Sequence, residues 1–558
     1  MQVDSIGNVV LDYSFYSSDN IYSDGDETEN LMFDIAKSEA WEDKLKNSNE
    51  WPILYHFSNL RWNLLEWLPF DKSDEVLEIG AGCGALTGLL AEKTGKVTCI
   101  ELSKRRSEIN AYRNKQYGNI EIFVGNFQDI KIDKRFDYVT LIGVLEYSNF
   151  YIKSEEPFLE MIKKAKSYLK EDGKLIIAIE NKMGLKYWNG APEDHTGKIY
   201  GGLNDYVDGR EERTFSKPEL INLLENGGFD SHHFYYPIPD YKLPNMVFSD
   251  SYLPDPGAVR TYRKNYSAPR IYNFFEDTVT DQLCADNMLQ YFANSFLVIC
   301  GNDSENVDYV VYSRERKPEF RIKTEILDNV DNRKTVVRSP LNSKAQKHIN
   351  QMAENRTKWE KILENVSCAE GELVGDNYVE SFISGKGLEA IMYDYRNNAK
   401  AFLEKTREIL RQYLTPKEDE LVNFKITNDY IEVFGENYLD NTYSSKCTNV
   451  DILFQNLKMD QYGKLYAFDF EWIFDFPIPY RYPLWRVAKE LYYKFKPQLI
   501  RRFDVELFTS ELGFTGEERK VFWEMEKAFS DYVCGKNQEE VYTKRYVKPS
   551  IMQYAKFC

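Results

Sequence analysis

The chain has 558 residues and a formal net charge of −18, with 71 Lys and Arg against 89 Asp and Glu. At about 150 residues per domain this length predicts two to four domains, and 43% hydrophobic residues exclude collagen-like, low-complexity and wholly disordered classes. Most of the acidity lies in residues 1–303, which hold 32 Lys and Arg against 48 Asp and Glu. Because nucleic acids are bound mainly through Lys and Arg contacts to phosphate, we expect no nucleic-acid partner.

The eight cysteines are scattered without a CxxC pair, a pattern typical of structural thiols in a reducing cytosol. Residues 1–12 lack the basic and apolar regions of a signal peptide, and no window approaches the roughly 18 uninterrupted apolar residues of a membrane span. We therefore predict a cytoplasmic protein without a transmembrane segment. A peripheral position at the inner face of the cell membrane is the alternative.

Residues 1–50 form the first predicted unit, an acidic, Tyr-rich arm with 3 Lys against 12 Asp and Glu. We expect a solvated or partly ordered arm, with a lid over a neighbouring site as the alternative. In the second unit, residues 51–303, short β-branched runs alternate with helical patterns, and strands are expected at 76–80, 97–102, 120–124, 138–145 and 174–180. This alternation predicts an α/β fold with a doubly wound, Rossmann-like sheet.

A polar run at 301–305 marks the boundary to the third unit, residues 304–558, where the order of elements changes. Strands are expected at 320–327 and 334–341, followed by a helix over 343–363 and a strand at 378–383. A long helix at 395–414, a hairpin-like segment at 451–472 and a helical tail complete the unit. This order predicts an α+β domain.

The first candidate site is a glycine-rich turn between a strand and a helix, formed by Gly80, Gly82 and Gly84 and preceded by Glu78. Glycines permit a tight turn in which the backbone comes close to a ligand. Glu101 ends the next strand about twenty residues later, where a carboxylate can accept hydrogen bonds from ribose hydroxyls. Rossmann dehydrogenases also combine a glycine-rich turn with an acid at the end of the second strand, but the G-x-G-x-G spacing differs from their G-x-G-x-x-G pattern. The third strand ends at Asn126 and Phe127, and the fourth at Glu146.

This set resembles the class I S-adenosylmethionine (SAM)-dependent methyltransferases over residues 74–180. The resemblance implies SAM as the cofactor, with the three glycines around its methionine part, Glu101 on the ribose, and Asn126 and Phe127 at the adenine. We also assign Glu78 and Glu146 to the cofactor site. Family members that methylate exocyclic amines of bases carry an Asn/Asp-Pro-Pro-aromatic run after strand four. The sequence Glu146-Tyr147-Ser148 departs from it, which argues further against a nucleic-acid acceptor.

Candidates for the acceptor side follow strand five, in residues 181–195. We predict His195 as the catalytic residue, acting as a general base or gripping an anion together with Lys182 and Lys186. Tyr187 is assigned to acceptor binding with the two lysines. A loop histidine that caps its own turn is the alternative for His195. The aromatic segment 234–244 is a candidate wall of the acceptor pocket, with core packing as the alternative.

A second candidate site lies in the third unit, where Asp451, Asn456 and Asp469 follow one another at spacings of five and thirteen residues. This spacing resembles the protein-kinase-like phosphotransferases of the aminoglycoside and choline kinase type. The resemblance implies Asp451 facing the acceptor hydroxyl, and Asn456 and Asp469 holding Mg²⁺ on ATP. It also places nucleotide-binding residues at Arg338, Glu380 and Phe382, with Glu354 as the partner of Arg338. Glycine is absent from 302 to 370, Asn449 replaces the usual His, and Arg338 replaces the usual Lys, so the nucleotide clamp departs from the family pattern.

The combination of the two units resembles the bifunctional chain-terminating methyltransferase–kinases of bacterial O-antigen and other surface-polysaccharide clusters. That resemblance implies phosphorylation and methylation of a glycan end, with glycosyltransferases of the same pathway as partners. The alternative is a methyltransferase for a sugar or other small acceptor whose kinase-like half is a non-catalytic binding or scaffolding module. A protein- or RNA-directed methyltransferase is disfavoured by the charge and by the missing Pro-Pro run.

Overall fold

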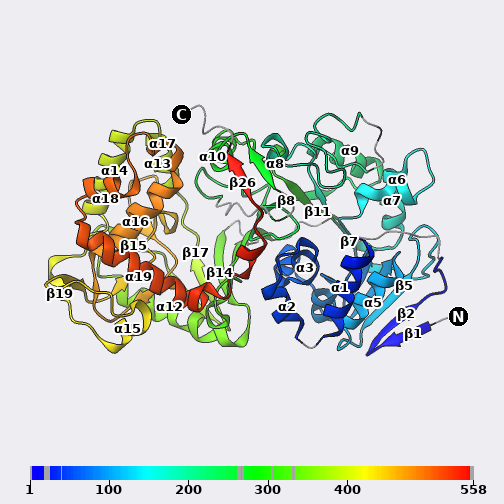
Figure 1. The fold of residues 1–558 in the computed structure, drawn as a ribbon, viewed down its shortest axis with the longest axis horizontal. Helices are drawn as coiled ribbons and strands as arrows, with labels where there is room; N and C mark the ends of the chain where they lie inside the picture. Colours follow the sequence, from blue (N-terminus) through cyan, green and yellow to red (C-terminus); the bar gives the residue numbers. More distant parts are fainter. Residues whose placement is uncertain are drawn as a thin grey trace.

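The computed structural model describes residues 3–17, 25–38, 40–207, 209, 212–259, 266, 269–302, 306–329 and 333–552. The chain forms two parts side by side along its longest axis, with the N-terminal residues in one and most of the C-terminal helices in the other (Figure 1). In the described residues, no helix combines the length and apolarity needed to cross a membrane.

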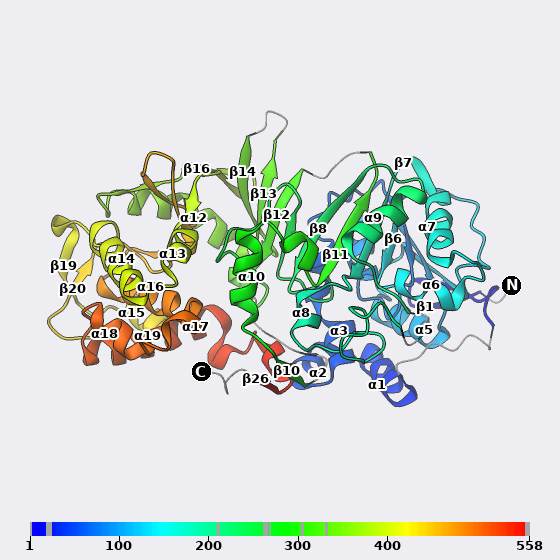
Figure 2. The ribbon, with the colours of Figure 1, turned by 90° about the horizontal axis from the view of Figure 1, so that it is seen from above.

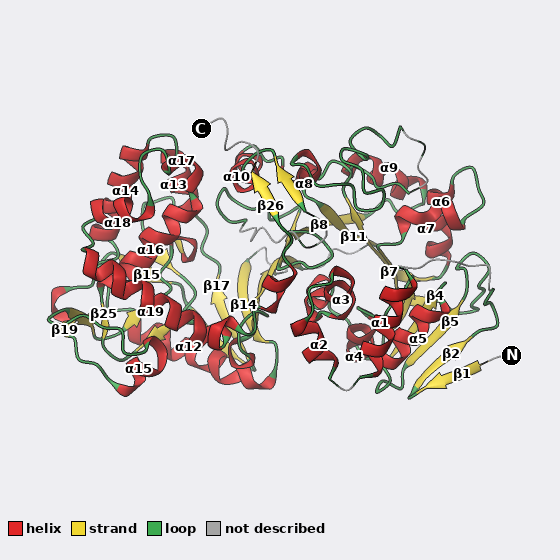
Figure 3. Cartoon of the chain, in the orientation of Figure 1, coloured by secondary structure: helices red, strands yellow, loops and turns green. Residues whose placement is uncertain are grey.

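The first part is built on five parallel strands in the order β5-β4-β3-β6-β7. Their bounds are β3 Glu75–Ile79, β4 Lys96–Glu101, β5 Ile120–Val124, β6 Phe136–Ile142 and β7 Leu169–Glu180. Helices α4 (Thr87–Lys93), α5 (Lys104–Arg113) and α7 (Pro157–Ser167) connect or flank them (Figure 3). Strands β3 and β4 are buried along almost their whole length because both faces of the sheet are covered. The predicted α/β, Rossmann-like sheet is therefore confirmed.

The described residues of the N-terminal arm are folded onto this sheet. The hairpin of β1 (Val3–Ile6) and β2 (Val9–Asp12) extends the sheet, because β2 pairs in parallel with β5. Helices α1 (Asp26–Lys37), α2 (Trp41–Asn47) and α3 (Trp51–Phe57) bury Met32, Leu54 and Phe57 against Ile109 of α5. The expectation of a solvated arm is wrong for these residues, because apolar side chains between the acids form a core.

The sheet does not stop at the predicted boundary between residues 303 and 304. After β7 it continues through β11 (Ser295–Cys300), β8 (His232–Ile238) and β9 (Met246–Ser249), and β9 pairs antiparallel with β12 (Val307–Tyr312). Beyond β12 lie β13 (Ile322–Asp328), β14 (Lys334–Pro340), β17 (Asn377–Ser381) and β16 (Gly371–Val374). One sheet of 15 strands thus runs through both parts, and Figure 2 shows β12 to β14 standing beside β8 and β11.

The rest of the second part is mainly helical, in the α+β arrangement expected. Its longer helices are α12 (Gln346–Trp359), α13 (Leu388–Tyr395), α14 (Ala399–Gln412), α16 (Arg481–Lys494) and α19 (Gly516–Cys534). Shorter helices include α15 (Asn428–Phe434) and α18 (Val505–Glu511). A small sheet joins β15 (Val366–Cys368), β23 (Leu465–Ala467), β22 (Leu457–Met459) and β18 (Lys386–Gly387). These elements share one large apolar core.

The C-terminal tail returns to the first part. The Tyr542 hydroxyl lies 2.6 Å from the Ser58 hydroxyl, and Arg545 donates to Asn47 Oδ1 at 2.8 Å. Strand β26 (Ser550–Met552) then pairs in parallel with β10 (Arg270–Tyr272), which precedes α10 (Glu276–Ala285) in the chain (Figure 1). Residues 304–558 therefore do not form a self-contained unit in space.

Candidate functional site

A cavity of about 510 Å³ lies at the carboxyl ends of β3, β4, β5 and β6. This is the edge at which open α/β sheets bind their ligands. The cavity brings together seven of the eight residues assigned to the cofactor site, namely Glu78, Gly80, Gly82, Glu101, Asn126, Phe127 and Glu146. His195 lies in its wall as well.

The turn after β3 requires glycine for two separate reasons. Gly80 has a φ of +70°, and a Cβ there would lie 2.4 Å from Cγ2 of Val144. Gly82 has a φ of +53°, and its missing side chain leaves open space. A side chain at position 82 would therefore project into the region that a ligand needs, whereas one at position 80 would clash with Val144, just after β6.

Glu101 fixes this turn from the end of β4. Its carboxylate accepts hydrogen bonds from the backbone N–H of Gly82 at 2.7 Å and of Ser103 at 2.8 Å. Burial raises the pKa of Glu101, and the Arg106 guanidinium opposes that shift. One carboxylate thus shapes the glycine turn and also lines the cavity where a ribose would lie.

Three further cofactor candidates line the same cavity with different surroundings. Glu78 accepts from Thr87 Oγ1 at 2.6 Å, and burial raises its pKa to about 7. Asn126 accepts from the backbone N–H of Gln128 at 3.0 Å. Phe127 is buried, with the Lys164 ammonium 4.5 Å from its ring centroid. An amide and a ring therefore remain side by side at the end of β5.

Gly84 is not among the residues that line the cavity, although it was assigned to the cofactor. Its φ is +76°, and a Cβ there would lie 2.3 Å from Asn110 Oδ1 and 2.7 Å from Asn114 Nδ2 of the neighbouring helix. The third glycine therefore permits close packing of the turn against α5.

We expect Gly84→Ala to lower the free energy of unfolding by about 2 kcal/mol or more. The alanine backbone would be strained at a positive φ, and its Cβ would overlap Asn110. Gly463→Ala is the matched control, because Gly463 has a φ of +82° but nothing within 4 Å of its missing Cβ. Urea denaturation measures both variants. A Gly84→Ala protein as stable as the control, but unable to bind S-adenosylhomocysteine (SAH), would show that Gly84 contacts the cofactor after all.

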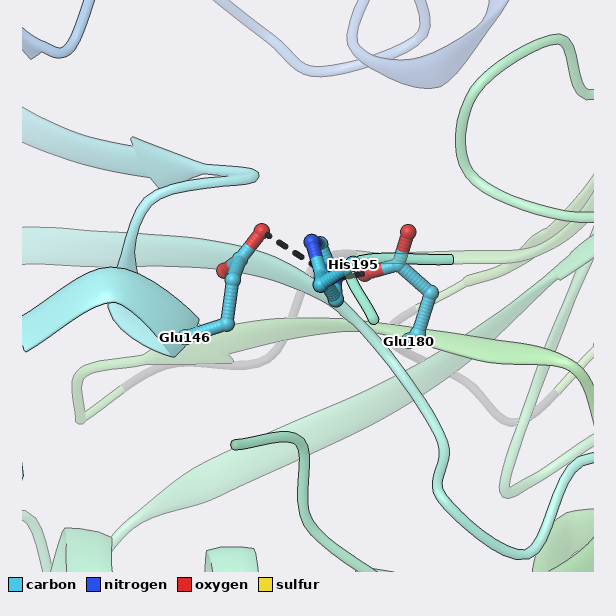
Figure 4. Close-up of side chains that lie close together, drawn as sticks. All are labelled: Glu146, Glu180 and His195. Atoms are coloured by element: carbon cyan, nitrogen blue, oxygen red, sulfur yellow. Dashed lines mark hydrogen bonds and ion pairs between the residues drawn. The ribbon is translucent and has the colours of Figure 1, made fainter. Parts of the chain in front are cut away.

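The far wall of the cavity holds His195 between two buried carboxylates (Figure 4). His195 Nε2 lies 3.3 Å from Glu180 Oε2 and 3.9 Å from Glu146 Oε1, and Nδ1 lies 2.9 Å from the Tyr147 hydroxyl. Burial alone would lower the pKa of His195, but Glu180 and then Glu146 raise it to about 9. Burial raises the pKa of Glu146 to about 8. The imidazole is therefore charged at neutral pH, which favours hydrogen-bond donation over the predicted role of general base.

Lys242 and Glu180 are functional candidates that the sequence analysis did not single out. Lys242 lines the cavity and forms ion pairs with Glu180 and with Asp194, the latter at 2.6 Å. Burial would raise the pKa of Glu180, but Lys242 and His195 hold it well below its usual range. The sequence contains a signal for both residues. Glu180 ends an apolar strand at the sheet's carboxyl edge, and Lys242 lies in the aromatic segment 234–244.

The three residues assigned to acceptor binding do not line the cavity. The Lys182 ammonium pairs with Glu219 at 2.6 Å, and that of Lys186 with Asp194 at 2.7 Å. The Tyr187 hydroxyl donates to Asp194 at 2.6 Å. Lys186 and Tyr187 therefore hold the Asp194 carboxylate, which lines the cavity, and the charge of Lys182 is neutralised by Glu219. Nearby acids thus keep these three side chains away from the cavity.

A second cavity, of about 590 Å³, lies between the two parts. It brings together all three predicted nucleotide-binding residues, Arg338, Glu380 and Phe382, with both predicted metal ligands, Asn456 and Asp469. The first part supplies one wall, which includes Phe248, Tyr252 and Asp255. Tyr252 meets the Phe382 ring edge-on, with ring centroids 6.0 Å apart.

Charged groups are closely paired in this second cavity. Arg338 forms an ion pair with Glu380 at 2.7 Å, in place of the expected Glu354, and its other nitrogen lies 3.9 Å from Asp469. Asp469 has a φ of +70°, which is uncommon for a non-glycine residue and often marks functional sites. Burial, followed by the nearby Glu471 carboxylate, raises the pKa of Asp469 to about 7. A second cation beside Asp469 would reduce the electrostatic repulsion between the Asp469 and Glu471 carboxylates.

Asp451, the predicted residue facing the acceptor hydroxyl, does not line the second cavity. Its Oδ1 pairs with Arg486 at 3.2 Å, and its Oδ2 accepts from Asn456 at 3.1 Å. Both carboxylate oxygens are therefore engaged within the protein.

The position of the first cavity at the carboxyl edge of the sheet agrees with what comparison with known proteins finds. Residues 77–175 match the family described as methyltransferase domain, so the chain contains such a domain. It is 35% identical over 114 residues to an uncharacterized methyltransferase of Staphylococcus carnosus (strain TM300), covering 20% of this chain and 51% of that protein. The chain thus spans about half the length of this relative.

Two other comparisons name different methyltransferases. The chain is 28% identical over 196 residues to ribosomal RNA small subunit methyltransferase A of Fusobacterium nucleatum, covering 34% of this chain and 68% of that protein. Among solved structures, phosphoethanolamine N-methyltransferase 1 of Haemonchus contortus, in complex with phosphoethanolamine and SAH, is 20% identical, with a TM-score of 0.27. That match covers 40% of this chain and 48% of the other. The family match ends at residue 175, and the kinase-like assignment of the second part stays a prediction.

Proposed function

We propose that this chain is a SAM-dependent methyltransferase that acts on a small acceptor. The observation that carries this proposal is the first cavity, where the glycine turn, Glu101 and the Asn126-Phe127 pair meet one wall of acid, imidazole and ammonium groups. When bound, SAM supplies an electrophilic methyl group on its sulfonium. Glu101 would hold the ribose, and His195 would orient an acceptor oxygen by donating a hydrogen bond to it.

The pairing of the lysines near the first cavity favours a hydroxyl or an amine over a phosphate as the acceptor. The acidic side chains that line the cavity are Glu78, Glu101, Glu146, Glu193 and Asp194, and the basic ones are His56, Arg61, Arg106, His195 and Lys242. Lys182 and Lys186, which were expected to supply a positive field, lie outside the lining and are paired with Glu219 and Asp194. The alternative of a sugar or small-molecule O-methyltransferase therefore fits better than methylation of a phosphate. The glycan end itself, and glycosyltransferases as partners, stay predictions.

Some relatives are ribosomal RNA methyltransferases by name, but an RNA acceptor is not favoured here. The acidic first part would repel a phosphate backbone, and Glu146-Tyr147-Ser148 stands where base-methylating families carry a Pro-Pro run.

Thermal unfolding with SAH tests the proposal. Saturation at about 100 times the dissociation constant stabilises a folded protein by about 2.7 kcal/mol, so we expect the melting temperature to rise by a few degrees. Methyl-labelled SAM, offered with sugars, amines and RNA, then identifies the acceptor class. A protein that shows no shift with millimolar SAH or SAM would contradict the proposal.

As a second candidate function, we propose that the second cavity binds Mg²⁺ and ATP. Its support is the meeting of Arg338, Glu380 and Phe382 with Asn456 and Asp469, where the two last residues would hold the metal. Because Asp451 lies outside the lining and is paired with Arg486, binding is better supported than phosphoryl transfer. A non-catalytic nucleotide module is thus favoured over a second active site.

We expect Mg·ATP to raise the melting temperature of the wild type by a few degrees, and Asp469→Asn to abolish the rise. Asp475→Asn is the matched control, since Asp475 lies in the same hairpin region but pairs with Lys358 at the surface. Equal shifts in both variants would place the nucleotide elsewhere, and no shift in the wild type would remove this function. The SAH result is independent of either outcome.

A further inference from the structure

Two side chains that line the first cavity, Glu146 and His195, converge with Glu180, which lies next to His195 outside the lining. Glu146 follows β6, Glu180 is the last residue of β7, and His195 lies in the loop beyond (Figure 4). One ligand atom from each lies within 4.8 Å of the other two. A cation at the centre of such a triangle would lie within roughly 2.5 Å of all three atoms, close to the distances of divalent cations to oxygen and nitrogen ligands.

Glu146 supplies an independent sign that a ligand is needed there. Its side chain is 1% exposed, and no described residue donates a hydrogen bond to its Oε2. Its other oxygen faces His195 at 3.9 Å, too far for a hydrogen bond. Burying a carboxyl oxygen without a hydrogen-bond partner is costly, and a cation beside it would offset that cost.

The surrounding groups hold the triangle in a fixed orientation. Tyr147 lies against Nδ1 of His195, which turns Nε2 toward the carboxylates. The backbone N–H groups of His195 and Thr196 donate to Glu193, which fixes the loop, and Lys242 holds the outer oxygen of Glu180. Supporting contacts of this kind orient the ligands of metal sites and set the histidine tautomer.

We propose that Glu146, Glu180 and His195 bind a divalent cation at the acceptor end of the first cavity. One imidazole nitrogen and two carboxylates suit Mn²⁺ or Zn²⁺ better than Ca²⁺. Glu146 and His195 line the cavity, so the remaining positions on the ion face the space available to an acceptor.

The role of the ion, unlike the site, rests on the proposed methyltransferase function. A bound cation lowers the pKa of a hydroxyl that it coordinates. The hydroxyl proton would leave to solvent and the acceptor oxygen would form the new C–O bond. The C–S bond of the sulfonium would break, with its electron pair left on sulfur. His195 would then bind the ion through an unprotonated Nε2, and the ion, in place of a hydrogen bond from His195, would orient the acceptor oxygen.

The test is Mn²⁺ binding to the full chain, followed by electron paramagnetic resonance without SAM or nucleotide. We expect one bound Mn²⁺ in the wild type, and affinity weakened at least tenfold in Glu146→Gln and His195→Gln. Asp469→Asn is the control that removes the predicted ligand of the second cavity, and it should keep this ion. Melting temperatures in chelator show whether each variant is folded.

A second measurement needs no variant. Electron spin-echo modulation from an imidazole nitrogen is expected on the bound Mn²⁺, because the predicted ligands of the second cavity, Asn456 and Asp469, include no histidine. Absence of Mn²⁺ and Zn²⁺ binding at millimolar metal would overturn the proposal, as would an ion lost in Asp469→Asn but kept in Glu146→Gln. SAH binding by the same metal-free protein would leave the proposed function standing.

Discussion

Glu101→Ala is expected to weaken SAH binding by about 100-fold. The carboxylate makes two charge-assisted hydrogen bonds, to the N–H groups of Gly82 and Ser103, and it would also accept from the ribose. At about 1.5 kcal/mol for each charge-assisted hydrogen bond, the loss of two bonds from the ribose hydroxyls amounts to about 3 kcal/mol of binding free energy. Isothermal titration calorimetry with SAH measures the change.

Glu121→Ala provides the control, because Glu121 lies on the adjacent strand β5 but pairs with Lys96 at 3.0 Å on the surface. We expect its SAH affinity to stay within twofold of the wild type. If both variants bind SAH as the wild type does, Glu101 is not a cofactor residue and the family assignment of this position fails.

Glu526→Gln is expected to lower the free energy of unfolding at pH 7 by about 3 kcal/mol, the cost of breaking a buried ion pair. Glu526 of α19 pairs with Arg486 at 2.7 Å and with Lys489 at 2.8 Å, and the two helices enclose much of the second part's core. The variant leaves both cations without this partner. Urea denaturation at pH 7 measures the loss, and Glu524→Gln, an exposed position on the same helix, is the control.

The stability that Glu526 contributes is also expected to depend on pH. Burial would raise the pKa of Glu526, but Arg486 and Lys489 lower it from its ordinary 4.5 to about 2. A depressed carboxyl pKa contributes stability that is fully present above the unfolded value and is lost as the pH falls through the folded value. The stability difference between wild type and Glu526→Gln should therefore shrink between pH 4.5 and pH 2. A difference that is constant over this range would show that the ion pair is not its source.

The first domain was predictable because its signals are local. Alternating strands and helices, glycines at the turn and an acid at the end of β4 all lie within about thirty residues of one another. Gly84 shows the limit: its spacing fits a cofactor turn, whereas its cause is contact with Asn110 on another helix. Local spacing cannot distinguish a glycine that faces a ligand from one that faces a neighbouring side chain.

Long-range pairings escaped prediction. The joining of β9 to β12 depends on two strands separated by more than fifty residues, and the same is true of Lys242 reaching Glu180. Lys182 and Lys186 illustrate the reverse error, because charges that look available in a loop form ion pairs with Glu219 of a distant helix and with Asp194 of the same loop. For the second cavity, the spacing of Asn456 and Asp469 anticipated their meeting, but not the pairing of Asp451 with Arg486.

The 15-stranded sheet also connects two walls of the second cavity. Phe248 of β9 and Arg338 of β14 both line that cavity. Strands β9, β12, β13 and β14 are hydrogen-bonded in this order, so a continuous ladder joins the two residues. The separation of these walls is therefore set by the spacing of neighbouring strands, about 4.8 Å each, rather than by the packing of separate domains.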